Sequence, residues 1–336
     1  MALLYNTVIT GRKSGCEMEE NTMKKIVSLI IALVLAFSCT AALAELTFTT
    51  GGTSGTYYAF GNVLAQFITN NSDVAVTAVA GNGSAANIDL LDIGDAQLGF
   101  VQNDVANYAL NGIRIYDGAP IDSFTAIAAL YDETVQLITC DPSITSVADL
   151  KGKNVSIGSQ GSGVYFNALD FLEAYGLTLD DINPQYQSFG DSAESLKDGK
   201  IDAAFVVAGA PTPAVVDLCT TKGAYLVSLD DEHVDKLIEI SSAYSKTLIP
   251  AGTYEGIDED VVTVGVKATI IANEDVTEDE AYTIVSTIFE NVDAITEAHA
   301  KGAELNLEYA SSCGLPYHAG AAKYFAEKGI EVEAAD

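Results

Sequence analysis

A short stretch rich in small residues occurs twice in this chain. The letters SGTYY at residues 54–58 return as SGVYF at residues 162–166, 108 positions later. Each copy follows a run of β-type residues and opens a segment whose apolar side chains have helical spacing. The sequence therefore predicts that one strand–loop–helix unit is built twice.

A second set of matching positions extends the repeat. Gly94 and Phe100, in a turn and the strand-like run after it, recur as Gly199 and Phe205 at an offset of 105 residues. The unit then reads strand, loop, helix, strand, helix, strand, an alternation typical of open, largely parallel α/β sheets. A chain of 336 residues is long enough for two cores. The predicted fold class is α/β with two lobes, each an open mixed β-sheet flanked by helices.

Crossing hinge strands are predicted to join the lobes. Residues 135–140 are the expected outward strand and residues 247–254 the expected return strand. Lobe 1 is then predicted to hold residues 45–139 and 246–336, and lobe 2 residues 140–245.

Two helices are expected near the C-terminus. Thr277 and Glu280 have the spacing of a capping box, at the start of an apolar stripe that runs to Ile295. A last helix, near residues 319–328, is expected to end with Gly329 just past its final turn.

The N-terminal segment has the pattern of an export signal. Residues 23–44 contain two lysines, about twelve mostly apolar residues and the small-residue end ALA at 42–44. We expect cleavage before Glu45, and a natural start after the extension at residues 1–22. A membrane anchor is one alternative, although the apolar run is shorter than the roughly 20 residues that span a bilayer. A lipoprotein anchored through Cys39 is another. A periplasmic or otherwise extracytoplasmic location is predicted.

The composition excludes several classes of partner. The formal net charge of −31 argues against nucleic acid or an anionic membrane surface. Arg114 is the only arginine beyond the first dozen residues, so no arginine cluster is available for binding. Cys140, Cys219 and Cys313 have the spacing of neither a zinc site nor a disulfide framework, and buried free thiols are expected, with one bridge at most. A monomer is expected.

The two glycine- and serine-rich helix starts are the candidate binding site. Helix N-termini suit anions because their first N–H groups are unpaired and the helix dipole is positive there. Two such loops facing each other across a cleft are predicted to hold a carboxylate without arginine. The alternative is that the small residues only permit tight turns from strand to helix.

Two strand ends are expected to complete the site. Gln102, Asn103 and Asp104 follow a buried strand, at the carboxyl end where α/β sheets place ligand groups. Their counterpart in the second unit is the stretch AGAP at residues 208–211, which has no polar side chain and is expected to supply backbone groups only. Asp104 is expected either to accept a hydrogen bond from a ligand ammonium or to cap the following helix, and both readings stay open.

No catalytic or nucleotide motif emerges. Neither loop fits GxxxxGK[ST] or GxGxxG, and GxSxG is absent. His233, His299 and His318 are scattered, and His318 is expected to make a structural hydrogen bond near a helix start. We predict a binding protein that is not an enzyme and that takes no cofactor and no metal. An exported α/β enzyme and a ligand-sensing module that docks a receptor are the rival hypotheses.

Seven segments, in order, resemble the TAXI family of solute-binding proteins of TRAP transporters. They are GGTSGTYY, GNGSAANIDLL, GDAQLGFVQNDV, DLKGKNVSIGSQGSGV, DGKIDAAFVVAGAP, IPAGTYEGIDEDVVTV and LPYHAGAAKYFAEKGI. The resemblance implies a type II periplasmic-binding fold that closes on a small carboxylate or amino acid, such as glutamate or glutamine. It also implies delivery of that solute to TRAP membrane permease subunits driven by an ion gradient.

The same resemblance implies the residues of the site. From lobe 1 these are Thr53, Ser54, Gly55, Thr56, Tyr57, Gln102, Asn103 and Asp104. From lobe 2 they are Ser159, Gln160, Gly161, Ser162, Gly163 and Val164, with Ala208, Gly209 and Pro211 as a wall. Tyr254 is a further expected contact. Gln160 stands where many members of the family have proline, which makes transfer of the ligand by analogy less safe.

Overall fold

The computed structural model describes residues 45–335, and within them ten strands form one sheet. The predicted signal peptide, its cleavage site and Cys39 lie outside the described residues. Along the sheet the strand order is β2-β1-β3-β10-β4-β7-β5-β6, with β8 paired to β4 and β9 to β10. Glu45–Asp336 forms one compact unit, and none of its described helices is long and apolar enough to cross a membrane.

The strand pairing confirms the predicted repeat. The first copy consists of β1 (Leu46–Thr49), α2 (Thr56–Asn71), β2 (Val76–Val79), α3 (Ser84–Asp92) and β3 (Leu98–Gln102). The second consists of β5 (Asn154–Ser156), α5 (Val164–Ala174), β6 (Asn183–Gln185), α6 (Phe189–Lys197) and β7 (Ala203–Ala208). In each copy the first strand is central: β1 pairs in parallel with β2 and β3, as β5 does with β6 and β7. Gly94 and Gly199 have φ of +78° and +67° in the turn before the third strand, a backbone conformation that favours glycine.

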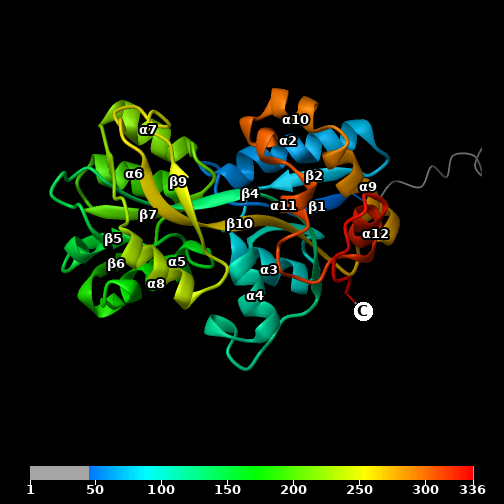
Figure 1. The fold of residues 1–336 in the computed structure, drawn as a ribbon, viewed down its shortest axis with the longest axis horizontal. Helices are drawn as coiled ribbons and strands as arrows, with labels where there is room; N and C mark the ends of the chain where they lie inside the picture. Colours follow the sequence, from blue (N-terminus) through cyan, green and yellow to red (C-terminus); the bar gives the residue numbers. More distant parts are fainter. Residues whose placement is uncertain (1–44, 336) are drawn as a thin grey trace, which may run out of the picture. The chain divides into compact units, whose positions relative to one another are not determined.

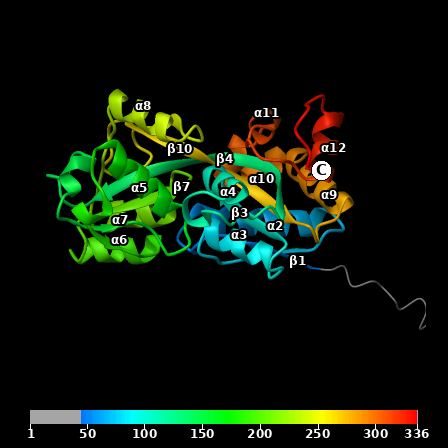
Figure 2. The ribbon, with the colours of Figure 1, turned by 90° about the horizontal axis from the view of Figure 1, so that it is seen from below.

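Two long strands connect the copies. β4 (Phe124–Thr139) and β10 (Val261–Asn273) pair antiparallel with each other. β10 also pairs with β3, and β4 also pairs with β7, both antiparallel. In Figures 1 and 2 the two copies lie at opposite ends of this strand pair. Below, lobe 1 means the first copy with α4 and α9–α12, and lobe 2 means the second copy with α7 and α8.

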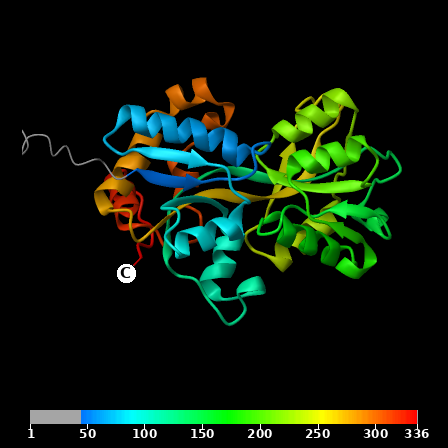
Figure 3. The ribbon, with the colours of Figure 1, turned by 180° about the vertical axis from the view of Figure 1, so that it is seen from behind.

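Helices cover both faces of the sheet in each lobe. The helices outside the repeat are α4 (Asn103–Asn111), α7 (Pro213–Thr221), α8 (Asp231–Ile240), α9 (Glu278–Phe289), α10 (Val292–Ala298), α11 (Leu307–Ala310) and α12 (Ala319–Glu327). In lobe 1, α2 and α10 lie on one side of the strands and α3 and α4 on the other; in lobe 2, α6 and α7 lie opposite α5 and α8 (Figure 1; from behind in Figure 3). This is the layered α/β arrangement that the sequence predicts.

The return strand differs from the prediction. Residues 247–254 do not cross between the lobes, because β9 (Ser245–Ile249) pairs only with the first part of β10. The crossing strand is β10, which is buried over nearly all its length, whereas β9 is mostly exposed. Strands with both faces covered are rich in apolar residues, and β10 is mostly valine, isoleucine and alanine. The lobe boundaries after residues 139 and 245 stay a prediction.

Alternation along β7 divides the core of lobe 2 into two layers. Ala203, Phe205 and Val207 belong to the buried cluster that includes α5 and α8. Ala204, Val206 and Ala208 belong to the cluster that includes α6 and α7. Successive side chains of a strand point to opposite faces of the sheet, so this one strand supports both layers. A separate cluster, built mostly from residues 46–131 and 268–325, forms the core of lobe 1.

Capping residues define the C-terminal helices. Thr277 and Glu280 form the predicted capping box at the start of α9. The expected stripe to Ile295 is two helices, because the Asn291 side chain bonds to the Thr287 carbonyl between α9 and α10, a local bond that competes with helix continuation.

The last helix begins and ends as the sequence predicts. His318 caps α12 through Nδ1, and its Nε2 lies 2.9 Å from the Val276 carbonyl oxygen, so its structural role is confirmed. Gly329, with φ of +79°, follows the last turn as expected. Cys140, Cys219 and Cys313 are free thiols.

Candidate functional site

A pocket lies between the two repeated helix starts. Gly55 is the N-cap of α2 and Gly163 the N-cap of α5, and both line the pocket. One lining residue belongs to β4. The rest of the lining comes from the loops after β1, β2, β5 and β6, the first residues of the helices that follow these loops, and the last residues of β3 and β7. These are carboxyl ends of parallel strands, where open α/β sheets bind ligands. The pocket volume, taken as the space open to the centre of a water-sized sphere, is about 90 Å³. This is enough for a small solute.

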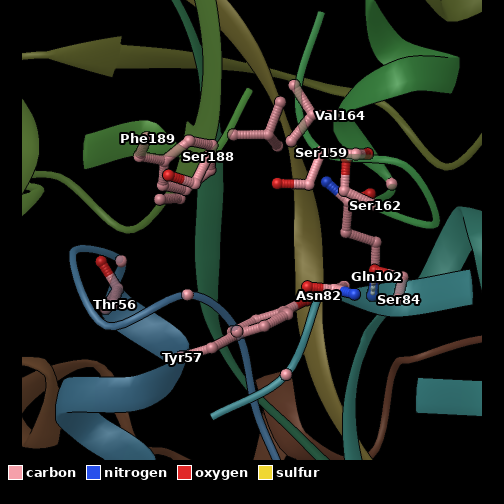
Figure 4. Close-up of a pocket in the computed structure, with 18 of the residues that line it drawn as sticks. Thr56, Tyr57, Asn82, Ser84, Gln102, Ser159, Ser162, Val164, Ser188 and Phe189 are labelled. Atoms are coloured by element: carbon pink, nitrogen blue, oxygen red, sulfur yellow. Dashed lines mark hydrogen bonds between the residues drawn. The ribbon is translucent and has the colours of Figure 1, made fainter. Parts of the chain in front are cut away.

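Part of the predicted site lines this pocket. The predicted residues at the pocket are Gly55, Thr56, Tyr57, Gln102, Ser159, Ser162, Gly163, Val164 and Ala208. Figure 4 shows Thr56 and Tyr57 on one side and Ser159, Ser162 and Val164 on the other. The predicted residues outside it are Thr53, Ser54, Asn103, Asp104, Gln160, Gly161, Gly209, Pro211 and Tyr254.

Three of the residues outside the pocket join the lobes instead. The carbonyl oxygens of Ser54, Gly161 and Gly209 each accept a hydrogen bond from the opposite lobe, at 3.2, 2.9 and 2.8 Å. A carbonyl committed to such a bond faces the opposite lobe rather than a solute. The repeated loops therefore have two tasks, closing the lobes on each other and lining the space that remains.

Five further residues outside the pocket are at the surface or in the cores. Thr53, Gln160 and Pro211 are exposed. The buried hydroxyl of Tyr254 donates to Gln136 of β4 at 2.6 Å. The side chain of Asn103 accepts from the Lys267 backbone N–H of β10 at 2.8 Å.

Asp104 lies outside the pocket lining, within the first turn of α4. Its side chain is fully buried, and Oδ1 accepts from the Val105 N–H while Oδ2 accepts from Asn167 Nδ2 across the lobes at 3.0 Å. The N-cap of α4 is Gln102. Burial raises the pKa of Asp104 to about 7. Asp104 thus belongs to a contact between the lobes.

The sequence reasoning missed the second pair of helix starts. The lining residues not predicted are Gly51, Gly52, Gly81, Asn82, Gly83, Ser84, Glu133, Ser188, Phe189 and Val207. α3 begins at Ser84 and α6 at Phe189, 105 residues apart, which is the offset of the repeat. Extending the repeat to the second helix of each unit would have found these loops. Glu133 carries no comparable signal, because it lies within the long strand β4.

Glu133 and Tyr57 are the only titratable side chains among the described residues that line the pocket. The Tyr57 hydroxyl donates to Glu133 Oε2 at 2.7 Å, and both side chains are buried. Burial raises the pKa of Glu133 well above its usual range, and burial together with the nearby Glu133 carboxyl raises that of Tyr57. Chemically, the site offers a buried carboxyl to a cationic group and helix N–H groups to an anionic one.

Comparison with known proteins gives a family match and several similar structures. The model of the NMT1-like family matches residues 48–329. A solved structure of a protein from Bordetella bronchiseptica RB50 is similar with a TM-score of 0.51 and 16% identity, covering 84% of this chain and 89% of that one. PhnD1 from Prochlorococcus marinus (MIT 9301), in complex with methylphosphonate, has a TM-score of 0.50 and 13% identity, covering 76% and 88%. The alkanesulfonate-binding protein SsuA from Xanthomonas axonopodis pv. citri has a TM-score of 0.47 and 16% identity, and the match covers 85% of this chain and 91% of that one.

These comparisons confirm the fold and correct the family. The predicted two-lobed, periplasmic-binding-protein-like α/β fold is that of the similar structures. The resemblance to the TAXI family is wrong, because the matching family model is the NMT1-like one. Five of the seven segments that suggested it lie in or beside the loops, strands and helix starts of the two repeat units. Such segments indicate the fold more than the family, and the TRAP permease loses its support as a partner.

Proposed function

Because the chain belongs to the NMT1-like family and has the fold of periplasmic binding proteins, we propose that it is an extracytoplasmic solute-binding protein. It captures a small solute in the pocket and delivers it to the membrane component of a transporter. The observation that carries this proposal is the pair of helix starts, since α2 and α5 bring equivalent N-termini to one pocket from opposite lobes.

The solute is a small carboxylate, and an amino acid of the size of glutamate or glutamine suits the site best. Each helix dipole contributes roughly 0.3–1 kcal/mol to holding a carboxylate, and each hydrogen bond to a charged group about 1.5–3 kcal/mol. Several such contacts reach the roughly −8 kcal/mol of micromolar binding. Glu133, buried beside Tyr57, is one acceptor for an ammonium group.

Function then consists of binding and closure, with no covalent step. A solute that contacts both lobes stabilises the closed arrangement and shifts the population toward it. Thr56 and Gly209 already bond to each other across the lobes, and the solute adds to such ties.

Thermal melting of the Glu45–Asp336 protein tests the proposal. The panel holds amino acids, simple carboxylates, alkyl phosphonates, alkanesulfonates and neutral sugars. A solute at a hundred times its Kd, bound only by the folded state, adds about 2.7 kcal/mol, which raises the melting temperature measurably. We expect the largest shift from an amino acid. A shift from neutral sugars alone would contradict the anion-binding helix starts, and no shift from any solute would contradict solute binding.

A further inference from the structure

Gln102 brings a free acceptor to the pocket wall. Its side chain lines the pocket and is 2% exposed. Its Nε2 donates to Asn167 Oδ1 at 3.0 Å, whereas its Oε1 has no hydrogen-bond partner among the described residues. A buried acceptor without a donor is costly, so the site calls for a donor from elsewhere. The chemistry of that donor depends on which end of the amide faces the pocket.

A series of hydrogen bonds that begins at Arg114 determines the orientation of the Gln102 amide. Arg114, the only arginine in residues 45–336, stands in the short helix Arg114–Tyr116 of lobe 1. Its guanidinium donates to Asp170 Oδ1 across the lobes at 2.6 Å. A guanidinium can only donate, so Asp170 is an acceptor. The Tyr244 hydroxyl, 2.9 Å from Asp170 Oδ2, therefore gives its single hydrogen to that carboxylate.

The next link is Asn167 on α5. The Tyr244 oxygen, its hydrogen already committed, accepts from Asn167 Nδ2 at 2.8 Å. Asp104 Oδ2 accepts from the same nitrogen at 3.0 Å. Both hydrogens of the Asn167 amide are then used, and its Oδ1 must face Gln102. Only the Gln102 nitrogen can donate to that oxygen, which leaves the Gln102 oxygen free.

The free oxygen lies against the start of α5. A side-chain carbon added at Gly163 would stand 1.5 Å from Gln102 Oε1. The same added carbon would stand 3.0 Å from Ser84 Oγ, which accepts from the Gln102 backbone N–H at 3.0 Å. Figure 4 shows Gln102 close to Ser84 in the same close-up as Ser162. The oxygen is thus held at the meeting point of both lobes.

We propose that Arg114, Asp170, Tyr244 and Asn167 are positioning residues, which hold Gln102 with its carbonyl oxygen as an acceptor in the pocket. The solute carries a protonated amine whose N–H group bonds to that oxygen, which makes it an amino acid and not a simple carboxylate. This inference rests on the proposed function, because it concerns the same pocket.

Matched probes test the amine. The pairs are L-alanine with propionate, L-glutamate with glutarate, and L-phenylalanine with 3-phenylpropionate, each titrated calorimetrically into the Glu45–Asp336 protein. In any pair that binds, the amino member should bind at least about tenfold tighter, the effect of one hydrogen bond to a charged group. Equal or weaker binding of the amino member overturns the proposal. If no pair binds, the carboxylate part of the proposed function fails, and the orientation of Gln102 is decided by the ligand-free measurement below.

Variants of Arg114 test the positioning. Arg114→Met should reduce the preference for the amino member toward one, with the affinity for its partner acid changed by less than about threefold. Arg114→Lys keeps a cation and should restore part of the preference. If Arg114→Met weakens both members of a pair equally, the residue only supports the fold, and the positioning role is overturned. Gln102→Met, which removes the acceptor at similar length, should lose the preference as well.

The orientation of Gln102 can be read without a solute. In the NMR spectrum of the wild-type protein, the Nε2 protons of Gln102, assigned by their loss in Gln102→Met, should show NOEs to Tyr244 ring protons or the Asn167 amide. Strong NOEs to the Gly163 α-protons would place nitrogen where the proposal needs oxygen. That result overturns it whatever the binding data show.

Discussion

Asp104, Asp132, Glu133 and Asp170 are carboxyl groups whose pKa is raised by burial. The values reach about 7 for Asp104 and about 6 for Asp132. A folded state that holds such protons more tightly than the unfolded chain is stabilised at low pH. That stability is lost as the pH rises through the folded-state pKa. The four groups act in the same direction.

We expect the free energy of unfolding to fall between about pH 4 and pH 7 in the window set by Asp104. Asp104→Asn has no proton to exchange, so its curve should fall less steeply over that window. Urea unfolding of both proteins at several pH values measures how steeply the free energy of unfolding of each protein falls with pH. Equal slopes would contradict the raised pKa of Asp104.

At the level of elements, the start of α5 has no room for a side chain. Gly163 has helical backbone angles, φ −68° and ψ −25°, so alanine there should stabilise the protein by about 0.4–1 kcal/mol through the unfolded state alone. The 1.5 Å approach to Gln102 Oε1 acts against this gain. Overpacking of that kind costs about 1–3 kcal/mol.

We therefore expect Gly163→Ala to lower the melting temperature by a few degrees, roughly 2–4 °C per kcal/mol. Gly52→Ala is the control, since an added methyl there meets nothing within 4 Å. Calorimetry of the two variants beside the wild type gives the comparison. A Gly163→Ala protein as stable as the wild type would mean that Gln102 moves away at no cost.

Elements built from neighbouring residues were predictable, and those that depend on distant partners were not. The helix starts at Gly55 and Gly163 follow from local glycine, serine and apolar spacing, and the structure has both. The return strand was misplaced because β9 and β10 differ in burial, which depends on what packs against them. Glu133 was missed for the same reason: only the pairing of β4 with β10 and β7 places it at the pocket.

At the level of the whole molecule, Asn167 is a tie between the lobes. It stands on α5 of lobe 2 and bonds to Gln102 and Asp104 of lobe 1. These bonds are buried and close the lobes without involving the solute. The closed arrangement is populated only while such contacts stabilise it more than conformational entropy stabilises the open arrangement. Removal of these contacts should therefore shift the population toward the open arrangement.

We expect Asn167→Leu to have a larger radius of gyration than the wild type in small-angle X-ray scattering. Asn183→Leu, the same change at an exposed position of β6 in lobe 2, is the control and should leave the radius unchanged. Equal radii for all three proteins would mean that the remaining lobe contacts are sufficient for closure.

The antiparallel pair β4 and β10 also decides whether half of this protein can exist alone. The first copy of the repeat ends with β3, which α4 follows, and one edge of β3 is covered only by β10, from the far end of the chain. A fragment cut after residue 111 would expose that edge as a row of unpaired backbone groups, a template for aggregation. The two copies are thus separable in sequence but not in solution, and a gene for a single copy would need a second chain to cover the open edge.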